Sequence, residues 1–518
     1  MPKSNKSYKP SSSVLNSSLT SIGKLFSETA KRNPEKIAII YGTKEISYNE
    51  LNNRVNSLTH FLADQNVTRG DCVALLSRNC DNFIEVELAA AKIGAICVNF
   101  NWRWTQPEVT HCLNLTSPKL IISSKEYEEI LNLSKQPPHL IFEKNYDEII
   151  NSYPEDEPNY SLDPEDGLVI IFTSGTTGMP KGALISHRAM IARALIFSSE
   201  YAVPKDDTFI AWTPLFHMGS NDFSLATLIR GGTVVVIDGY QPEEIIQVIE
   251  NRRVHYLTVI PGMIEDFIHK LKENNCKPKP IGMIGAMADL VPRSMLKEIT
   301  ELLNAPYLNT FGSTETGNPP ASAGFIPIGS APENLAKKQS AFCEIRLVDQ
   351  YDEEVSDGQP GELAIRGPSL FSGYWGNEEA NKEAFRNGWF HMGDVFKRDK
   401  MGLIHFVDRV KYMIKSGGEN IYPAEIEQYI LTDQRVSEVV VVRKKDSKWG
   451  EVPVAFISAV SNKLSEEDVL GMLKGKIASY KLPKEIHFVD PSFFPRTGTG
   501  KVQRHLVEKS LTRMGPKS

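Results

Sequence analysis

Through the first half of the chain, short runs of β-branched and apolar residues alternate with stretches that repeat apolar residues at helical spacing. The runs include 36–42, 72–77 and 119–123, and the helical patterns between them include 48–65 and 82–94. The alternation continues at LVIIF (168–172), TVVVID (233–238) and VHYLTVIPG (254–262). This pattern is typical of α/β layers with largely parallel strands. It predicts a large α/β N-terminal domain.

The pattern changes after residue 340, where short strands are separated by turns, as in 344–367. This texture predicts a more antiparallel subdomain. The stretch FVDRVKYMIKSGGENIYPAEIE (406–427) then passes from a strand through a Gly-Gly turn to a helix start after Pro423. We expect a small mobile α+β domain beyond it.

Composition and charge are those of an ordinary globular protein: 41% hydrophobic residues, 24% charged residues and a net charge of -6. A chain of 518 residues is longer than the chains that fold around a single hydrophobic core, so two or more domains are expected. The charge predicts no general attraction to nucleic acid. The six cysteines show neither zinc-site pairs nor disulfide density, which favours the cytoplasm.

No membrane-spanning segment is predicted. The most apolar long stretch, 83–100, carries Glu85, Glu87 and Lys92, which favours a core helix running into a strand. The polar, Ser-rich residues 1–20 lack the apolar region of a secretory signal and are expected to be a disordered lead-in.

A hydroxyl-rich and glycine-rich loop, TSGTTGMPKG (173–182), follows the run at 168–172 and precedes a helical pattern. Its hydroxyl groups, glycines and lysine suit phosphate oxygens at a strand end; they are Thr173, Ser174, Gly175, Thr176, Thr177, Gly178 and Lys181. Taken alone, the loop is also compatible with an ordinary flexible turn between a strand and a helix. Its spacing excludes a Walker A loop, and no Gly-x-Gly-x-x-Gly follows this strand.

The loop resembles the phosphate loop of the acyl-adenylate-forming superfamily, which includes acyl-CoA synthetases, peptide-synthetase adenylation domains and beetle luciferases. Further matches follow in family order, at WTPLFHMG (212–219), NTFGSTE (309–315), GWFHMGD (388–394), DRVKYMIKSGGENIYPAEIE (408–427) and PRTGTGKVQR (495–504). The resemblance implies an AMP-binding domain at 21–408, a hinge at 409–411 around Lys411, and a lid domain at 412–518.

The resemblance also implies a site for ATP and Mg²⁺. Its expected catalytic residues are Lys181, Thr314, Glu315 and Lys501, with Glu315 and Thr173 on the metal. Further nucleotide contacts are expected from Gly312, Ser313, Asp394, Arg409, Lys415 and Asn420, where Asp394 would accept hydrogen bonds from the ribose hydroxyls. Met392 replaces the usual family threonine. Without the resemblance, Glu315 reads as a helix-capping acid, Asp394 as a turn aspartate, and Lys501 as a solvated charge.

For coenzyme A, the resemblance implies Ser416, Gly417 and Gly418 along the pantetheine path. Glu419 stands where some relatives carry arginine, so no CoA phosphate contact is assigned there. The acyl pocket is expected at His217, Met218, Asn221, Gly285, Ala286, Met287 and Phe311. His217 is equally compatible with a structural histidine. Gly285-Ala286-Met287-Ala288 departs from the family's Gly-Gly-Ala-Pro-like turn, which leaves the shape of the pocket open.

The resemblance therefore predicts an ATP-dependent carboxylate–CoA ligase that forms an acyl-AMP and then an acyl-CoA, acting on a fatty or other apolar acid. An enzyme that loads a carrier protein, or that stops at acyl-AMP, is an alternative. A nucleotide-binding protein without catalysis is another, against which the presence of Glu315, Asp394, Arg409 and Lys501 argues. Monomer and homodimer both stay open.

Overall fold

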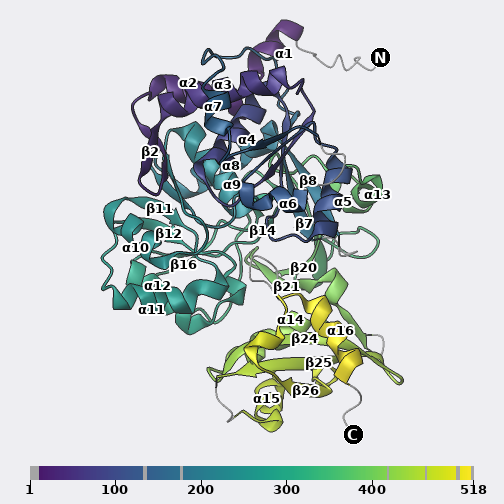
Figure 1. The fold of residues 1–518 in the computed structure, drawn as a ribbon. Helices are drawn as coiled ribbons and strands as arrows, with labels where there is room; N and C mark the ends of the chain where they lie inside the picture. The colour runs from purple at the N-terminus through teal and green to yellow at the C-terminus, as the bar shows by residue number, and fades with distance from the viewer. Residues whose placement is uncertain are drawn as a thin grey trace, which may run out of the picture.

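The computed structural model describes residues 11–131, 137–174, 179–416, 419–460, 464–496 and 502–514. A large N-terminal part lies above a smaller C-terminal part, and strand β21 (Ile404–Arg409) leads from one to the other (Figure 1). Helix α1 lies at the top of the N-terminal part, and α16 lies beside α14 in the C-terminal part (Figure 1).

One sheet of the N-terminal part has the strand order β6-β5-β3-β4-β7-β8, and its neighbours run parallel except for β7 and β8. The strands are β3 (Cys72–Leu76), β4 (Ile96–Asn99), β5 (Leu120–Ser123), β6 (His139–Ile141), β7 (Gly167–Ser174) and β8 (Pro180–Ser186). Successive residues of a strand enter different cores: Val73 and Leu75 face one cluster, and Ala74 and Leu76 face another. The sheet is therefore buried on both faces, as a parallel sheet requires.

A second sheet has the order β16-β13-β12-β11-β9-β10-β1-β2, parallel from β13 to β1 and antiparallel at both edges. Its strands are β1 (Ile37–Tyr41), β2 (Lys44–Ser47), β9 (Thr208–Ala211), β10 (Thr233–Val236), β11 (Val254–Leu257), β12 (Ile281–Ile284), β13 (Tyr307–Leu308) and β16 (Phe325–Ile326). The predicted α/β class with largely parallel strands is confirmed.

Helices form layers on both sides of these sheets. The central core, shared by the inner faces of the two sheets, contains α2 (Ile22–Arg32), α3 (Tyr48–Asp64), α4 (Asp81–Ile93), α7 (Tyr146–Ile150), α8 (His187–Tyr201) and α9 (Met218–Arg230). The outer face of the first sheet is covered by α5 (Gln106–Thr116) and α6 (Glu128–Leu131). The outer face of the second is covered by α10 (Pro242–Asn251), α11 (Ile264–Glu273) and α12 (Arg293–Leu303).

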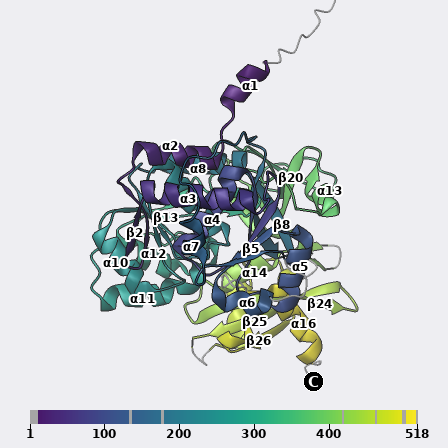
Figure 2. The ribbon, with the colours of Figure 1, turned by 45° about the horizontal axis from the view of Figure 1, so that its top comes forward.

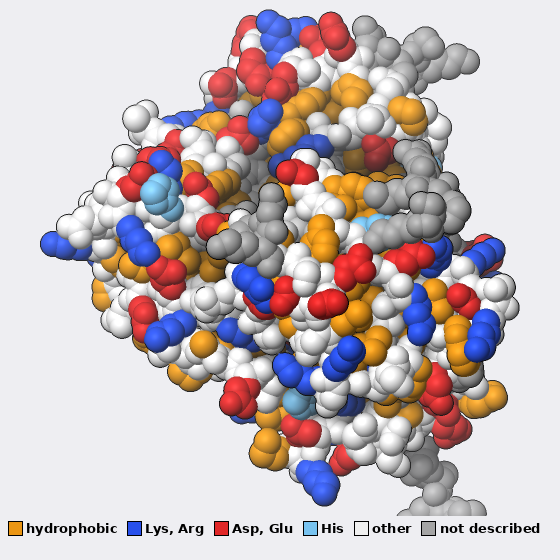
Figure 3. Space-filling model, turned by 90° about the horizontal axis from the view of Figure 1, so that it is seen from below, with side chains coloured by type: hydrophobic (Ala, Val, Ile, Leu, Met, Phe, Trp, Pro, Cys, Tyr) orange, Lys and Arg blue, Asp and Glu red, His pale blue; other side chains and the backbone are white. Residues whose placement is uncertain are grey.

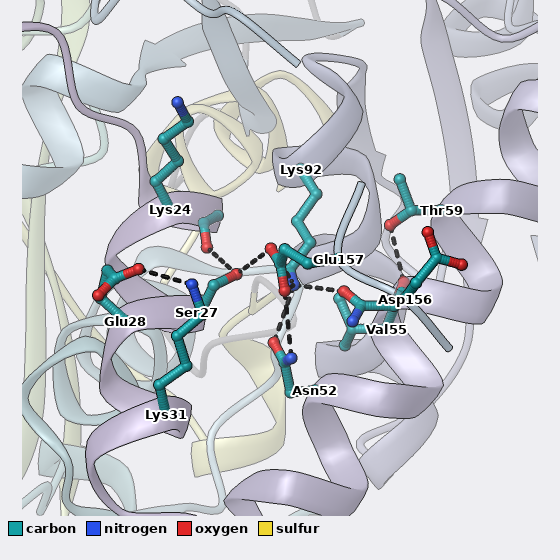
Figure 4. A network of polar contacts seen from close by, with 12 residues as sticks. Lys24, Ser27, Glu28, Lys31, Asn52, Val55, Thr59, Lys92, Asp156 and Glu157 are labelled. Atoms are coloured by element: carbon teal, nitrogen blue, oxygen red, sulfur yellow. Dashed lines mark hydrogen bonds and ion pairs between the residues drawn. The ribbon is translucent and has the colours of Figure 1, made fainter. Parts of the chain in front are cut away.

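The stretch 83–100 forms α4 and β4, as predicted, and its charged residues are buried with partners. Glu85 accepts hydrogen bonds from Arg54 Nε at 2.8 Å and from Tyr146 Oη at 3.0 Å. Lys92 Nζ donates to Asn52 and Asn56 of α3 and lies 2.9 Å from Glu157 Oε1 (Figure 4). Because Glu157 also accepts from Ser27 of α2, this network anchors the loop before β7 onto three helices.

The loop at 173–182 does not connect a strand to a helix, so that expectation was wrong. Strands β7 and β8 form an antiparallel hairpin in which Thr173 pairs with Lys181, and α8 begins only after Ser186. Ser186 caps α8 by accepting from the Ala189 amide. The predicted phosphate loop therefore lies at a hairpin tip, where the amides of a helix N-terminus do not contribute.

The expected antiparallel subdomain is present. Its strands are β17 (Glu344–Val348), β18 (Pro360–Arg366), β19 (Phe385–Arg386), β20 (Trp389–Arg398) and β21, with α13 (Glu378–Ala384) beside them. A short ribbon of β14 (Gly312–Ser313) and β15 (Gly317–Pro320) lies between this sheet and the α/β layers.

The C-terminal part is α+β, with the sheet order β23-β22-β25-β24 and β26 paired to β25. Its elements are β22 (Ile414–Ser416), β23 (Glu419–Ile421), α14 (Pro423–Ile430), β24 (Val436–Asp446), β25 (Gly450–Ala459), α15 (Glu466–Leu473), β26 (Glu485–Phe488) and α16 (Arg504–Met514). Seen from below, its surface mixes acidic and basic side chains (Figure 3). This face carries no large field of one sign.

Helix α1 (Ser12–Ser18) lies within the segment expected to be disordered, and it stands away from the body of the molecule (Figure 2). Its described side chains are exposed. A helix this short gains little stability without packing. Among the residues that the structure describes, no helix is long and apolar enough to span a membrane.

Candidate active site

Glu315 and Lys181, from two separate motifs, meet at one tyrosine. Tyr374 Oη donates a hydrogen bond to Glu315 Oε1 at 2.9 Å, and Lys181 Nζ lies 5.5 Å from the centroid of the Tyr374 ring. The segment 371–375 also bonds both motifs through its backbone: the Phe371 amide donates to Glu315 O, and the Trp375 amide donates to Gly182 O. The fold therefore places the start of β8 beside the NTFGSTE motif.

Asp394 and Arg409 form an ion pair across neighbouring strands β20 and β21. Their backbones are in register, and Arg409 Nε lies 2.8 Å from Asp394 Oδ1. The Asp394 side chain is 3% exposed and that of Arg409 is 43% exposed. The charge of Asp394 raises the pKa of the Arg409 guanidinium against the effect of its burial, and Glu315 adds to the rise. Glu315 is thus near enough to interact with Arg409 electrostatically.

Thr314 lies just before Glu315 and is buried, and its carbonyl oxygen accepts from Arg193 Nη2 at 2.9 Å. Arg193, on α8, also pairs with the buried Asp222 of α9 at 2.9 Å. Gly312 and Ser313 form β14. A Cβ atom at Gly312 would lie 2.0 Å from Gly317 O, so the ribbon requires glycine there.

The first predicted acyl segment is the start of α9. His217 caps the helix, since its Nδ1 accepts from the Gly219 amide at 3.1 Å. Met218 is half-buried against the central core. Asn221 is fully buried, and its Nδ2 donates to Glu87 Oε1, so this side chain supports the segment from within the core. The capping contact fits the structural reading of His217.

The second predicted acyl segment is a tight turn after β12. Gly285 has φ +86° and Met287 has φ +53°. The Ala286 amide donates to Val259 O at 3.0 Å, and the Met287 amide donates to Thr310 Oγ1 at 2.9 Å. Phe311 packs edge-on against Phe396 at 4.7 Å, so it joins the nucleotide motif to the antiparallel sheet.

In the C-terminal part, the predicted residues lie on the hairpin of β22 and β23. Lys415 and Asn420 are exposed and pair with each other in register, and Ser416 is buried and pairs with Gly450 of β25. Lys411 is exposed in the short helix Val410–Tyr412, with its Nζ 5.0 Å from the Tyr412 ring centroid.

Several predicted site residues lie outside the described residues. They are Gly175, Thr176, Thr177, Gly178, Gly417, Gly418 and Lys501. Of Ser174 only the backbone is described, at the end of β7, next to Thr173.

Two features beside the site were not predicted from the sequence. One is Tyr374, in FSGYWG, which carries no residue pattern that marks it as a partner of Glu315. The other is Lys337, a fully buried lysine whose Nζ lies 2.6 Å from both Asp289 Oδ2 and Asn309 Oδ1. This lysine joins the turn at 285–290 to the NTFGSTE motif.

The donor set at Glu315 fits a magnesium ion in part. Mg²⁺ prefers one or two carboxylates together with substrate phosphates and water. Glu315 offers such a carboxylate, because its hydrogen bond to Tyr374 uses only Oε1. Among the described residues, no group of three or more His, Cys, Asp or Glu side chains forms a closed metal cage.

The architecture is that of an α/β protein with a large N-terminal domain and a small C-terminal domain. The AMP-binding enzyme family matches residues 26–375, and the AMP-binding enzyme C-terminal domain matches residues 425–501. The chain therefore belongs to the AMP-binding enzyme family.

Named relatives span almost the whole chain. The indoleacetate–CoA ligase of Aromatoleum aromaticum is 31% identical over 497 residues, covering 93% of this chain and 96% of that protein. The feruloyl-CoA synthase of an Amycolatopsis species is 30% identical, covering 93% and 97%. The structure of Bacillus subtilis o-succinylbenzoate CoA synthetase with ATP and magnesium ion has a TM-score of 0.79 and 25% identity, covering 93% of this chain and 98% of that one.

Proposed function

We propose that the protein is an ATP-dependent carboxylate–CoA ligase that makes an acyl adenylate and then an acyl-CoA thioester. The observation that carries this proposal is the convergence of Lys181, Glu315, Asp394 and Arg409, from four separate motifs, around Tyr374 and the end of β21. Two acids and two bases at one place suit a substrate that carries phosphates and ribose hydroxyls.

In the first step, a carboxylate oxygen attacks the α-phosphorus of ATP, and the bond to pyrophosphate breaks. In the proposed assignment, Lys181 balances phosphate charge and the buried Asp394 accepts hydrogen bonds from the ribose hydroxyls. Arg409 holds the Asp394 carboxylate in place through their ion pair. Lys501, from the C-terminal part, is proposed to stabilise the charge that develops on the α-phosphate.

Glu315 and Thr173 are the residues proposed to hold Mg²⁺. The ion would supply charge neutralisation of the ATP phosphates. Tyr374 orients the Glu315 carboxylate through its hydrogen bond.

In the second step, the CoA thiol attacks the acyl carbonyl carbon, the bond to AMP breaks, and the thioester forms. The hairpin at 414–421 and the hinge at Lys411 are proposed to serve this step, with the lid domain at 412–518 in a second orientation. A separate carrier-protein thiol is the alternative acceptor.

We further propose an apolar carboxylic acid, with aryl acids ahead of fatty acids. Met218, Met287 and Phe311, from the segments predicted to form the acyl pocket, are apolar and partly buried. The names of the relatives point to aryl-bearing acids: indoleacetate, ferulate and 2-succinylbenzoate.

The test incubates the protein with Mg·ATP, CoA and a panel of arylacetic, cinnamic, benzoic and fatty acids, and follows AMP, pyrophosphate and thioester by mass spectrometry. Formation of a thioester with one acid class supports the proposal. Formation of acyl-AMP without a thioester supports the alternative in which a carrier protein is the acceptor. Lys501→Ala should lose adenylation while still binding ATP, whereas Lys400→Ala, at an exposed turn, should behave as wild type. Unchanged turnover in Lys501→Ala refutes the role given to that lysine.

A further inference from the structure

We propose that Tyr374 is a positioning residue for adenylation, which holds the Glu315 carboxylate and keeps the Lys181 ammonium apart from it. This inference rests on the proposed function. Its basis is that one side chain contacts two predicted catalytic groups: its hydroxyl donates to Glu315 Oε1 at 2.9 Å, and its ring centroid lies 5.5 Å from Lys181 Nζ. The second distance is within the range of a cation–π contact.

The position of Tyr374 is fixed from several directions. Asn381 of α13 holds its backbone with two hydrogen bonds, accepting from the Tyr374 amide at 2.7 Å and donating to its carbonyl oxygen at 3.0 Å. Its neighbours bond to β8, and Tyr374 itself bridges to Ala183. The ring also packs edge-on against Phe371 at 4.9 Å. Such a support gives the hydroxyl a defined direction.

The hydrogen bond to Glu315 has a direct chemical use. It occupies Oε1, which leaves Oε2 for a second partner such as a cation. A carboxylate held by a hydrogen bond loses less conformational entropy when a ligand binds.

The ring contact has a complementary use. A lysine close to a glutamate would ordinarily form an ion pair with it, and each would then neutralise the other. Among the described residues, no salt bridge joins Lys181 to Glu315, and the Tyr374 ring lies against the ammonium instead. A cation–π contact is weaker than a desolvated ion pair, so Lys181 can leave it for a phosphate group. Tyr374 thereby preserves one positive and one negative group for two different parts of Mg·ATP.

The hydroxyl and the ring can be tested separately. Tyr374→Phe removes only the hydroxyl, and Tyr374→Leu removes the ring as well. The matched control is Tyr153→Phe, which deletes a similar phenol–carboxylate hydrogen bond, to Asp64 at 2.8 Å, on the far helical layer. Melting temperatures of all three variants should stay near that of wild type.

Two measurements are made on each variant: ATP–pyrophosphate exchange with the best acid of the panel, and calorimetric binding of ATP with and without Mg²⁺. For Tyr374→Phe we expect kcat to fall about tenfold, with the KM of the acid unchanged. Mg·ATP should bind about tenfold more weakly, and metal-free ATP as in wild type. Tyr374→Leu should also weaken the binding of metal-free ATP, because without the ring Lys181 can pair with Glu315, and this ion pair competes with the phosphate group.

Failure of this inference differs from failure of the proposed function. If wild type exchanges pyrophosphate and Tyr374→Phe stays within about twofold of it in both measurements, the positioning role is refuted. If wild type exchanges nothing with any acid, the proposed function fails, and the calorimetric comparison alone decides the role of Tyr374. Equal losses in Tyr374→Phe and Tyr153→Phe would indicate a purely structural effect and would also overturn it.

Discussion

Replacing Gly285 by alanine should distort the turn that carries the second predicted acyl segment. Gly285 has φ +86°, a conformation that L side chains rarely adopt. A Cβ atom built on it would lie 2.1 Å from Cζ of Tyr307. Ordinary carbon contacts are about 3.5–4 Å, so the ring or the turn has to move by more than an ångström.

Moving either the Tyr307 ring or the turn costs free energy. Tyr307 is fully buried, and its hydroxyl donates to Ala286 O at 2.8 Å and lies 3.3 Å from Val259 O. The left-handed φ costs about 1 kcal/mol, and forcing a methyl group into a packed core costs about 1–3 kcal/mol. Breaking the hydroxyl contacts adds about 1 kcal/mol. We expect a destabilisation of about 3–5 kcal/mol.

Gly239→Ala is the matched control, because Gly239 has φ +83° and no atom within 4 Å of an added Cβ. It should show only the backbone cost of about 1 kcal/mol. Chemical denaturation followed by fluorescence gives the difference between the two variants, and ATP–pyrophosphate exchange gives the KM of the acid. A Gly285→Ala protein as stable as Gly239→Ala, with an unchanged KM, would show that Tyr307 does not confine the turn.

Three further predictions concern buried polar groups. Burial raises the pKa of Glu87 to about 8, so between about pH 4.5 and 8 the folded state holds a proton that the unfolded state has lost. Glu87 therefore lowers the free energy of unfolding by about 1 kcal/mol per pH unit as pH rises through that window. In urea titrations at several pH values, Glu87→Gln should remove this decline. An unchanged dependence of the unfolding free energy on pH would contradict a buried neutral acid. Lys92→Met should cost about 2–4 kcal/mol in the same titrations because it leaves Glu157 without its cation, and adding Glu157→Gln should recover part of that cost. Three cysteines are buried and three half-buried, and burial raises the pKa of every thiol. At pH 7.5 maleimide should therefore label the native protein far more slowly than the denatured one, and equal labelling rates would contradict this protection.

Much of the fold follows from the sequence pattern, because parallel strands buried on both faces leave near-continuous apolar runs. The hairpin of β7 and β8 was the exception. Its second strand, PKGALIS, is short and begins with residues that suit a turn, so the sequence pattern predicts a loop that leads into a helix. A period of two was nevertheless present: Ala183 and Ile185 enter the central core, and Leu184 packs on the outer one.

The site was predictable where a residue belongs to a motif and unpredictable where it depends on distant partners. Glu315, Asp394 and Arg409 were assigned by resemblance, and the structure brings them together. Tyr374 lies 59 residues from Glu315, and Lys337 lies 28 residues from Asn309. No local sequence pattern predicts such pairings, because the role of a buried lysine or a half-buried tyrosine depends on the distant residues that the fold places in contact with it.

The junction between the two parts of the molecule is itself a buried polar structure. Asp408, just before Arg409, accepts from the Ala424 amide at the start of α14, and burial raises its pKa to about 6. Arg504 pairs with Glu427 of α14 at 2.8 Å and lies 5.0 Å above the ring of Tyr412. Arg504, Glu427 and Tyr412 all lie in the proposed lid domain and can turn together, whereas the bond from Ala424 to Asp408 crosses the proposed hinge. A rotation about Lys411 that moves α14 away from β21 therefore has to break this buried bond to Asp408.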